Sequence, residues 1–436
     1  MKAYEETEEQ MSGKSKVVNA LRTIAAVLTA GMLWLASAVA PAQAADPVKV
    51  GVGLALTGAG ASPGKMVLAA LEMWRDDVNA KGGLLGRPIE LIHYDDQSNP
   101  ANVPGLYTKL ITVDKADLLL GPYGTNFVAP AMPTIIQQGK MTISFTAIGI
   151  NRQFNYGKYF SMVPVGPDGA NAFSKGFFNL AAAQNPKPQT VAILAADAEF
   201  AKAAADGARE ELKKHGFKIV YDQSYPQSTA DFAPVVRAIQ AANPDIVYIG
   251  AYPPDTVGIV RAANEIGLTP KMFGGAMIGL LITPIKVQLG PVANGIIIGE
   301  SFLPSTKLQF AGLDGLMKRY QAKAPELKTD PIGYAFVPFG YAAGEVLAQA
   351  VTETKGLDHD KLAAYMHSHS FKTVVGEISF GKDGEWAKPR QLTTQFQNVE
   401  PNNLDQFRDG KKQPILYPPE YKDGNLIYPY ADARKK

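Results

Sequence analysis

The sequence predicts an α/β protein with two lobes of similar size, each a parallel sheet flanked by helices. After residue 46, short apolar β-rich runs alternate with segments of helical periodicity, and the alternation restarts near residue 190. Such alternation is typical of parallel sheets with crossover helices. The chain has 436 residues, of which 46% are hydrophobic and 19% are charged. This composition indicates a globular protein, and the length favours two to three domains of roughly 150 residues.

The first series of elements ends near residue 147. Residues 48–56 are almost continuously apolar, which indicates a buried strand, and residues 65–79 have the apolar spacing of a helix. Asn99 and Pro100 mark the start of another helix, as an N-cap and a first-turn proline. The other expected elements here are strands at 89–94, 117–121 and 141–147 and a helix at 127–138.

The second series has no residue-level similarity to the first. Its expected strands are 190–195, 216–222, 245–250, 271–275 and 295–300, and its expected helices are 201–214, 232–242 and 256–266. Then come expected helices at 313–322, 337–354 and 360–367 and strand-like segments at 373–380 and 391–397. Because this last third lacks parallel-strand alternation, we expect it to complete the two lobes. Residues 411–436 are expected to be irregular and to lie over a surface.

The first 44 residues have the pattern of a secretory signal peptide. Basic residues between Lys14 and Arg22 precede an uncharged apolar run at 24–40, and Ala42-Gln43-Ala44 fits the small-x-small cleavage pattern. A retained membrane anchor is the alternative, but the run is short for a span of about 20 residues. We therefore expect cleavage after Ala44 and a periplasmic product.

Charge and cysteine content exclude several kinds of protein. Lys and Arg number 43 and Asp and Glu number 41, a net charge of +2, so we expect no nucleic-acid partner. The absence of Cys excludes disulfides, thiolate nucleophiles and cysteine-ligated metal centres. With five His in the chain, we expect no metal site and no cofactor.

Nucleotide-binding and catalytic motifs are incomplete. Gly51 and Gly53 would begin a dinucleotide fingerprint, but Leu56 stands where its third Gly belongs. Asp95-Asp96 is expected to serve a loop rather than acid–base chemistry, because adjacent residues at a strand end point to opposite faces. No Gly-x-Ser-x-Gly nucleophile elbow occurs. A secreted enzyme is therefore the weakest interpretation.

The candidate ligand site is Gly121-Pro122-Tyr123-Gly124-Thr125-Asn126, between an expected strand and an expected helix. Ligands of open α/β sheets bind at the carboxyl ends of strands. A helix N-terminus offers free N–H groups and a positive dipole end, which suit a carboxylate. Thr125 and Asn126 would add side-chain donors, with simple N-capping as the alternative.

Several motifs follow one another in a characteristic order: 78–91 (V-N-A-K-G-G-L-L-G-R-P-I-E-L), Tyr94-Asp95-Asp96, Gly121-Pro122 with Thr125, Ile143-Ser144 with Ala147, Asp231-Phe232, and Pro244-Asp245 before Gly250-Ala251-Tyr252. Together they resemble the periplasmic solute-binding proteins of branched-chain amino acid ABC transporters, the leucine/isoleucine/valine-binding type. This resemblance implies a type I periplasmic-binding fold, with two Rossmann-like lobes joined by a three-crossing hinge and the ligand in the interlobe cleft. The first lobe would hold residues 46–164 and 302–374, and the second residues 165–301 and 375–410.

The resemblance also implies site residues. Thr125, next to Tyr123 and Asn126, matches the residue that holds the ligand carboxylate, and Ala147 matches a strand position that meets the ligand. Phe200 and Tyr252 would line the cleft from the second lobe.

The sequence departs from amino acid binders of this family where they hold the ligand ammonium. Their acidic residue corresponds to Ala276, which is followed by Met277, and a helping hydroxyl residue corresponds to Ile148. An unpaired buried ammonium costs on the order of several kcal/mol. We therefore expect an apolar or aromatic carboxylate without an α-amino group. An amino acid held by a relocated acid, Asp197 or Glu199, is the alternative.

The resemblance implies a monomeric binding protein, not an enzyme, that delivers its small ligand to an inner-membrane ABC permease. A ligand sensor that feeds a membrane kinase is the alternative from another class.

Overall fold

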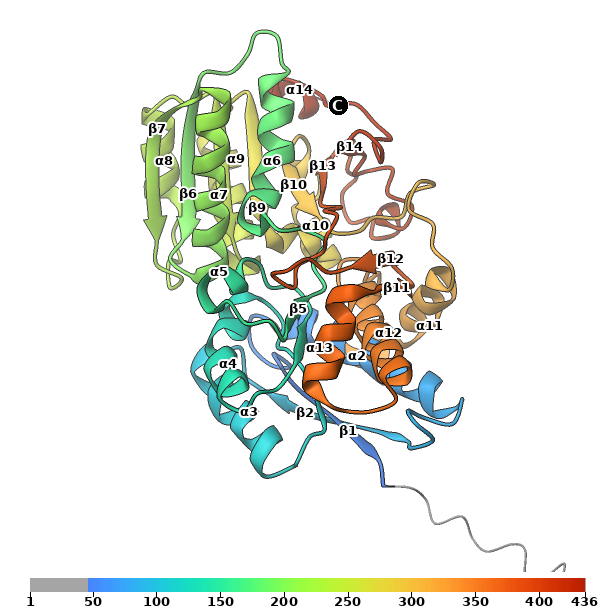
Figure 1. The fold of residues 1–436 in the computed structure, drawn as a ribbon. Helices are drawn as coiled ribbons and strands as arrows, with labels where there is room; N and C mark the ends of the chain where they lie inside the picture. Colours follow the sequence, from blue (N-terminus) through green and yellow to red (C-terminus); the bar gives the residue numbers. More distant parts are fainter. Residues whose placement is uncertain (1–45, 436) are drawn as a thin grey trace, which may run out of the picture. The chain divides into compact units, whose positions relative to one another are not determined.

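The computed structural model describes residues 46–435, so the predicted signal peptide lies outside the described residues. One sheet, whose strands β1 and β2 lie at the bottom of Figure 1, has five parallel strands in the order β2-β1-β3-β4-β5. These strands are β1 (Val48–Leu54), β2 (Ile89–Asp95), β3 (Leu118–Leu120), β4 (Thr142–Ser144) and β5 (Tyr159–Ser161). We call this sheet and the helices packed on it the first lobe.

The other sheet has seven strands in the order β14-β13-β10-β9-β8-β6-β7 and defines the second lobe. Its parallel part consists of β6 (Thr190–Ala196), β7 (Lys218–Tyr225), β8 (Ile246–Ala251), β9 (Met272–Met277) and β10 (Ile297–Glu300). The antiparallel strands β13 (Leu392–Gln395) and β14 (Ile415–Tyr417) extend one edge.

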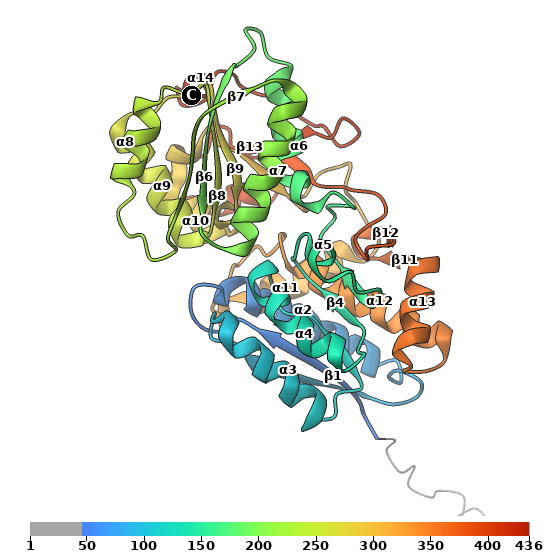
Figure 2. The same ribbon diagram turned by 60° about the vertical axis from the view of Figure 1, so that its left-hand side comes forward.

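Helices cover both faces of the first sheet (Figure 2). Along β1, Val48, Val50 and Val52 belong to the core that also contains α2 and α12, whereas Gly51 and Gly53 face α3. The ring of Tyr107 on α3 lies against Gly53, and its hydroxyl accepts from Gly53 N over 3.3 Å and donates to the carbonyl of Leu120 over 2.6 Å. The absence of side chains at Gly51 and Gly53 therefore leaves room for α3 to pack closely on β1. This packing accounts for the two glycines without a bound nucleotide. The helices of this lobe are α2 (Ala61–Asn79), α3 (Val103–Thr112), α4 (Thr125–Gln137), α5 (Ile150–Phe154), α11 (Leu313–Leu327), α12 (Val337–Thr354) and α13 (His359–Ser368).

The second lobe has its own core, formed by strands β6, β8, β9 and β10 and the helices around them. Its helices are α6 (Gly169–Ala182), α7 (Glu199–His215), α8 (Ala233–Ala241), α9 (Pro253–Ile266), α10 (Thr283–Leu289) and α14 (Tyr430–Ala433). Within residues 46–435 the chain passes between the sheets three times, after β5, after β10 and before β13. Two of these passages touch where Arg390 N donates to the carbonyl of Pro164 over 2.7 Å.

Several segments differ from the sequence-based expectation, among them β5, α5 and α10, for which no element is expected. The strand-like segment 373–380 is part of a hairpin of β11 (Ser370–Thr373) and β12 (Gly376–Ser379), with the turn at Val374 and Val375. Helix α6 was not expected at all. Residues 411–436 were expected to be irregular, but they contain β14 and α14, and the ring of Tyr430 stacks on Phe273 at 5.4 Å.

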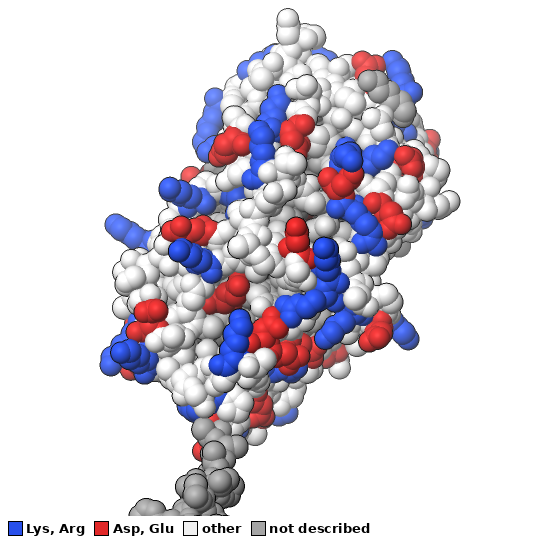
Figure 3. Space-filling model, turned by 90° about the vertical axis from the view of Figure 1, so that its right-hand side faces the viewer, with Lys and Arg blue, Asp and Glu red and all other residues white. Residues whose placement is uncertain are grey.

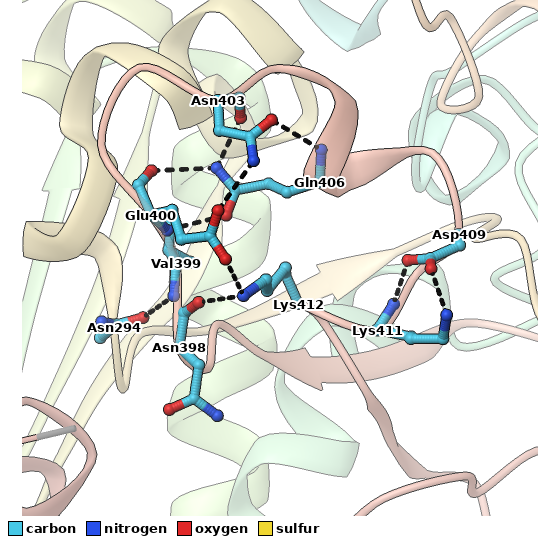
Figure 4. Close-up of polar contacts among 9 residues, drawn as sticks. All are labelled: Asn294, Asn398, Val399, Glu400, Asn403, Gln406, Asp409, Lys411 and Lys412. Carbon is cyan, nitrogen blue, oxygen red and sulfur yellow. Dashed lines mark hydrogen bonds and ion pairs between the residues drawn. The ribbon is translucent and has the colours of Figure 1, made fainter.

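The segment that leads to β14 is held by its own polar contacts and by the second lobe (Figure 4). Val399 N donates to Asn294 Oδ1 over 2.8 Å, and Lys412 Nζ contacts Glu400 Oε1 at 2.9 Å and the carbonyl of Asn398 at 2.6 Å. The C-terminal segment is therefore part of the second lobe.

The surface carries charges of both signs. On the face shown in Figure 3, acidic and basic side chains are interspersed. Among the helices of residues 46–435, none is long and apolar enough to span a membrane.

Candidate functional site

A cavity of about 300 Å³ lies between the two lobes, with walls from both. This volume is at the lower end of the range for small-molecule sites. Its first-lobe wall includes segments that follow β1, β2, β3 and β4, and its second-lobe wall includes segments that follow β6, β7, β8, β9 and β10. Since parallel strands end at the same edge of their sheet, each lobe presents its carboxyl edge to the cavity.

The segment after β3 is shaped by Gly124. Its φ of 85° and ψ of 150° are readily adopted only by glycine, and they turn the chain so that α4 begins at Thr125. The hydroxyl oxygen of Thr125 accepts from Ile148 N over 3.1 Å. Because that oxygen is already an acceptor, its hydrogen is available to donate toward the cavity that Thr125 lines.

Asn126 joins the two lobes. Its side-chain oxygen accepts from the backbone N–H of Phe200 over 3.1 Å and from the hydroxyl of Tyr252 over 2.9 Å. The N–H of Phe200 can only donate, so this bond fixes which end of the amide faces the second lobe. Burial raises the pKa of Tyr252 to about 12, so its hydroxyl stays protonated and able to donate. The amide nitrogen of Asn126 then remains available to a ligand.

Aromatic rings from both lobes contribute to the apolar wall. Phe173 and Phe200 meet edge to face at 5.4 Å, as do Tyr123 and Phe336 at 5.4 Å, one pair from each lobe. The aromatic lining residues are Tyr123, Phe127, Phe173, Phe200, Tyr252 and Phe336. This wall suits a flat or branched apolar body.

Asp255 is the one charged side chain among the described residues that line the cavity. It lies in the first turn of α9, is 5% exposed, and accepts from the hydroxyl of Tyr225 over 3.1 Å. Burial raises the pKa of its carboxyl group. Asp197 and Glu199, suggested above as relocated acids, do not line the cavity, and Asp197 pairs with Lys202 at 2.6 Å.

The structure brings five of the nine predicted site residues to this cavity: Tyr123, Thr125, Asn126, Phe200 and Tyr252. Ala147, Ile148, Ala276 and Met277 do not line it. All four are buried in hydrophobic cores, Ala147 beside α4 and the other three in the second lobe. After β9 the chain turns, so that Ile278 and Leu281 reach the cavity in place of Ala276 and Met277.

Sequence reasoning missed part of the lining. The other lining residues are Ala59, Gly60, Ser98, Pro100, Thr146, Val163, Gln227, Pro253, Pro254, Ser301 and Ala335. Ser98, Thr146 and Gln227 each follow a parallel strand within a few residues. The rule that ligands meet strand carboxyl ends, applied to every strand, would have found them.

The Asp95-Asp96 pair does not line the cavity but holds the segments that follow β1 and β2 beside it. Asp95 Oδ1 accepts from Leu56 N over 2.9 Å, and its other oxygen accepts from the hydroxyl of Thr57 over 2.7 Å. Asp96 accepts from Ser98 N over 2.8 Å, and burial raises its pKa to about 6. Among residues 46–435, no cluster of His, Asp or Glu has the arrangement of a metal site.

A family model described as "Periplasmic binding protein" matches residues 47–396. The chain belongs to the periplasmic binding protein family. This confirms the resemblance inferred from the sequence motifs, and the two lobes with parallel sheets are the fold expected for it. Residues 397–435 lie beyond the match and include β14 and α14.

Several proteins that are similar to this chain have names or solved complexes that identify a ligand. The Leu/Ile/Val-binding protein of Escherichia coli K12 is 25% identical over 341 residues, which cover 78% of this chain and 88% of that protein. A solute-binding protein of an ABC transporter from Rhodopseudomonas palustris, solved with 3,4-dihydroxybenzoic acid, has a TM-score of 0.67 at 21% identity and covers 81% of this chain and 94% of that one. A branched-chain amino acid transporter substrate-binding protein from Streptococcus pneumoniae, solved with isoleucine, has a TM-score of 0.68 at 21% identity. The match covers 86% of this chain and 100% of that one. These structures support the fold.

Proposed function

We propose that this periplasmic binding protein captures a small carboxylate with an aromatic or apolar body and no α-amino group, and delivers it to an ABC permease. The observation that carries the proposal is the N-terminus of α4, where Thr125 and Asn126 face a cavity walled by six aromatic residues. The Rhodopseudomonas palustris protein with bound 3,4-dihydroxybenzoic acid shows that this fold accepts such ligands.

The carboxylate would be bound from the first lobe. The first turn of α4 has N–H groups without a helical acceptor and lies at the positive end of the helix dipole. The Thr125 hydroxyl and the Asn126 amide nitrogen add two donors. Hydrogen bonds to a charged acceptor are about twice as strong as neutral ones. The aromatic residues would enclose the rest of the ligand, away from this polar end.

A second candidate is an amino acid, and Asp255 is the observation that favours it. Its buried carboxyl group lines the cavity and could pair with a ligand ammonium. The Escherichia coli relative is named for binding leucine, isoleucine and valine. Tyr225 and the start of α9 already engage this carboxyl group, which weakens its claim as a ligand group.

The cellular role follows from the family. The predicted signal peptide would place the mature protein in the periplasm, and closure of the lobes over the ligand would create the form that the permease recognises. No set of nucleophile, base and orienting group faces the cavity among the described residues, so we propose a binding protein rather than an enzyme. A sensor that feeds a membrane kinase would use the same closure.

Titration of the mature chain with benzoate, 3,4-dihydroxybenzoate, a branched keto acid and leucine tests the proposal. A ligand at about 100 times its Kd should stabilise the protein by about 2.7 kcal/mol in a thermal shift experiment. We expect stabilisation by acids without an amine. Tight binding of leucine, lost in Asp255→Asn but not in Tyr225→Phe, would instead support the amino acid candidate.

A further inference from the structure

The side chain of Thr146 lines the cavity, and its hydroxyl oxygen is buried without a hydrogen-bond partner among the described residues. Buried polar atoms in folded proteins nearly always have a partner, so an orphan in a cavity wall calls for an explanation. A molecule in the cavity can provide the missing partner once the hydroxyl rotates toward it. This hydroxyl makes no hydrogen bond to another described residue, so no such bond accounts for it in the fold.

Thr146 stands beside the proposed carboxylate site. It follows β4, which pairs with β3 through Leu120 and Ile143, and Thr125 follows β3 at the same edge. Two residues further on, Ile148 N donates to the hydroxyl oxygen of Thr125 over 3.1 Å. The segment that carries Thr146 is therefore pinned against the first turn of α4. Thr125 and Thr146, which follow two neighbouring strands, therefore both line the cavity.

We propose that Thr146 is a ligand-binding residue whose hydroxyl donates to the carboxylate held at α4, an inference that rests on the proposed function. A carboxylate has two oxygens and about four acceptor positions, so donors that follow β3 and a donor that follows β4 can bind the same group. Rotation about the Cα–Cβ bond of a threonine moves its hydroxyl between staggered positions without backbone movement. A bound anion would select the position in which the hydroxyl faces the cavity.

The chain contains a matched control for this inference. Thr142 lies four residues earlier, within β4, and its hydroxyl oxygen is also buried without a partner, but Thr142 does not line the cavity. Valine has the shape of threonine without the hydroxyl. Thr142→Val and Thr146→Val therefore remove the same kind of orphan group, one outside the cavity and one in its wall.

The experiment measures calorimetric affinity for the best-binding acid and the melting temperature of the ligand-free protein. Thr146→Val should weaken binding by about 10-fold or more, the effect of a hydrogen bond to a charged group, while its melting temperature stays level or rises. Thr142→Val should bind as the wild type does, and Thr146→Ser should retain most of the affinity.

The outcomes separate this inference from the proposed function. Wild-type affinity in Thr146→Val, or an equal loss in Thr142→Val, overturns the role of Thr146 and leaves the proposed function standing. A wild-type protein that binds leucine but none of the other acids overturns the proposed ligand class, and Thr146→Val is then titrated with leucine, whose carboxylate requires the same donor. A wild-type protein that binds no carboxylate overturns both.

Discussion

The hydroxyl of Tyr252 donates to the side-chain oxygen of Asn126 over 2.9 Å, and this bond joins the second lobe to the first beside the cavity. The backbone N–H of Phe200 donates to the same oxygen over 3.1 Å. One side chain of the proposed carboxylate site thus contacts two neighbouring residues of the second-lobe wall. Asn126 would therefore take part both in the closure of the lobes and in the binding of the ligand.

Loss of the Tyr252 hydroxyl should therefore loosen the closed form. A neutral hydrogen bond contributes about 0.5–1.5 kcal/mol, so we expect Tyr252→Phe to weaken ligand binding by roughly 2- to 10-fold. Small-angle scattering should show the wild type contracting when ligand is added, and the variant should need more ligand for the same contraction. An unchanged radius of gyration at saturating ligand would argue against hinge closure.

Thr125 should have two separable roles. Its oxygen accepts from Ile148 N, and its hydrogen is proposed to reach the ligand. Thr125→Val should weaken carboxylate binding by roughly 10- to 150-fold and, by leaving a buried N–H unpaired, should also destabilise the ligand-free protein by about 1–3 kcal/mol. Thr125→Ser keeps both bonds and should restore both properties. Calorimetry that finds equal affinities for Thr125→Val and the wild type would remove Thr125 from the site.

The sequence predicts the site best where one local rule decides the geometry. Thr125 and Asn126 follow a strand and open a helix, and Tyr252 directly follows β8, so the carboxyl-edge rule places all three. The rule cannot say which of several neighbouring residues lines the cavity, because the turn after each strand sets the direction of the side chains. Thr146 lines the cavity, although the family resemblance indicated Ala147. Ile278 lines it in place of Ala276 and Met277.

Elements were missed where distant contacts decide the structure. Helix α6 contains Gly176, a poor helix residue, but a Cβ there would lie 2.0 Å from the hydroxyl oxygen of Thr393. The turn between β11 and β12 is Val374-Val375, whose β-branched residues resemble a continuing strand, and only Gly376, at a φ of 94°, marks the bend. Strand β14 has three residues between two prolines, too few for a periodic signal.

The buried pair of Lys286 and Glu300 should be important for stability at the passage that follows β10. Lys286 Nζ lies 3.2 Å from Glu300 Oε1, the side chains are 7% and 1% exposed, and Gln413 Nε2 donates to the same oxygen over 2.9 Å. Removal of one partner from a buried ion pair costs about 3–5 kcal/mol, because the other charge is left uncompensated. We expect this loss for Lys286→Met in urea unfolding.

The double variant Lys286→Met, Glu300→Gln should recover much of that stability, since no uncompensated charge remains. A double variant that is less stable by the sum of both single losses would show that the two residues do not act as a pair. Gln413→Leu tests the C-terminal segment separately, because it removes the amide that contacts both charges while leaving the ion pair in place.

His359 should make stability depend on pH. Its Nδ1 accepts from Met141 N over 3.0 Å, and burial, helped by the charges of Lys140 and Lys158, lowers its pKa from 6.5 to about 4. The unfolded chain therefore binds more protons than the folded chain between these values, so stability falls as the pH is lowered from 6.5 to 4. After allowance for partial exposure, we expect this residue to account for about 1–3 kcal/mol of that loss.

Buried carboxyl groups also titrate in this range, so the informative quantity is the difference in stability between the wild type and His359→Asn, whose side-chain oxygen can still accept from Met141 N. The variant should lose less stability between pH 7 and pH 4 in urea unfolding, and parallel curves for the two proteins would assign the pH dependence to other groups.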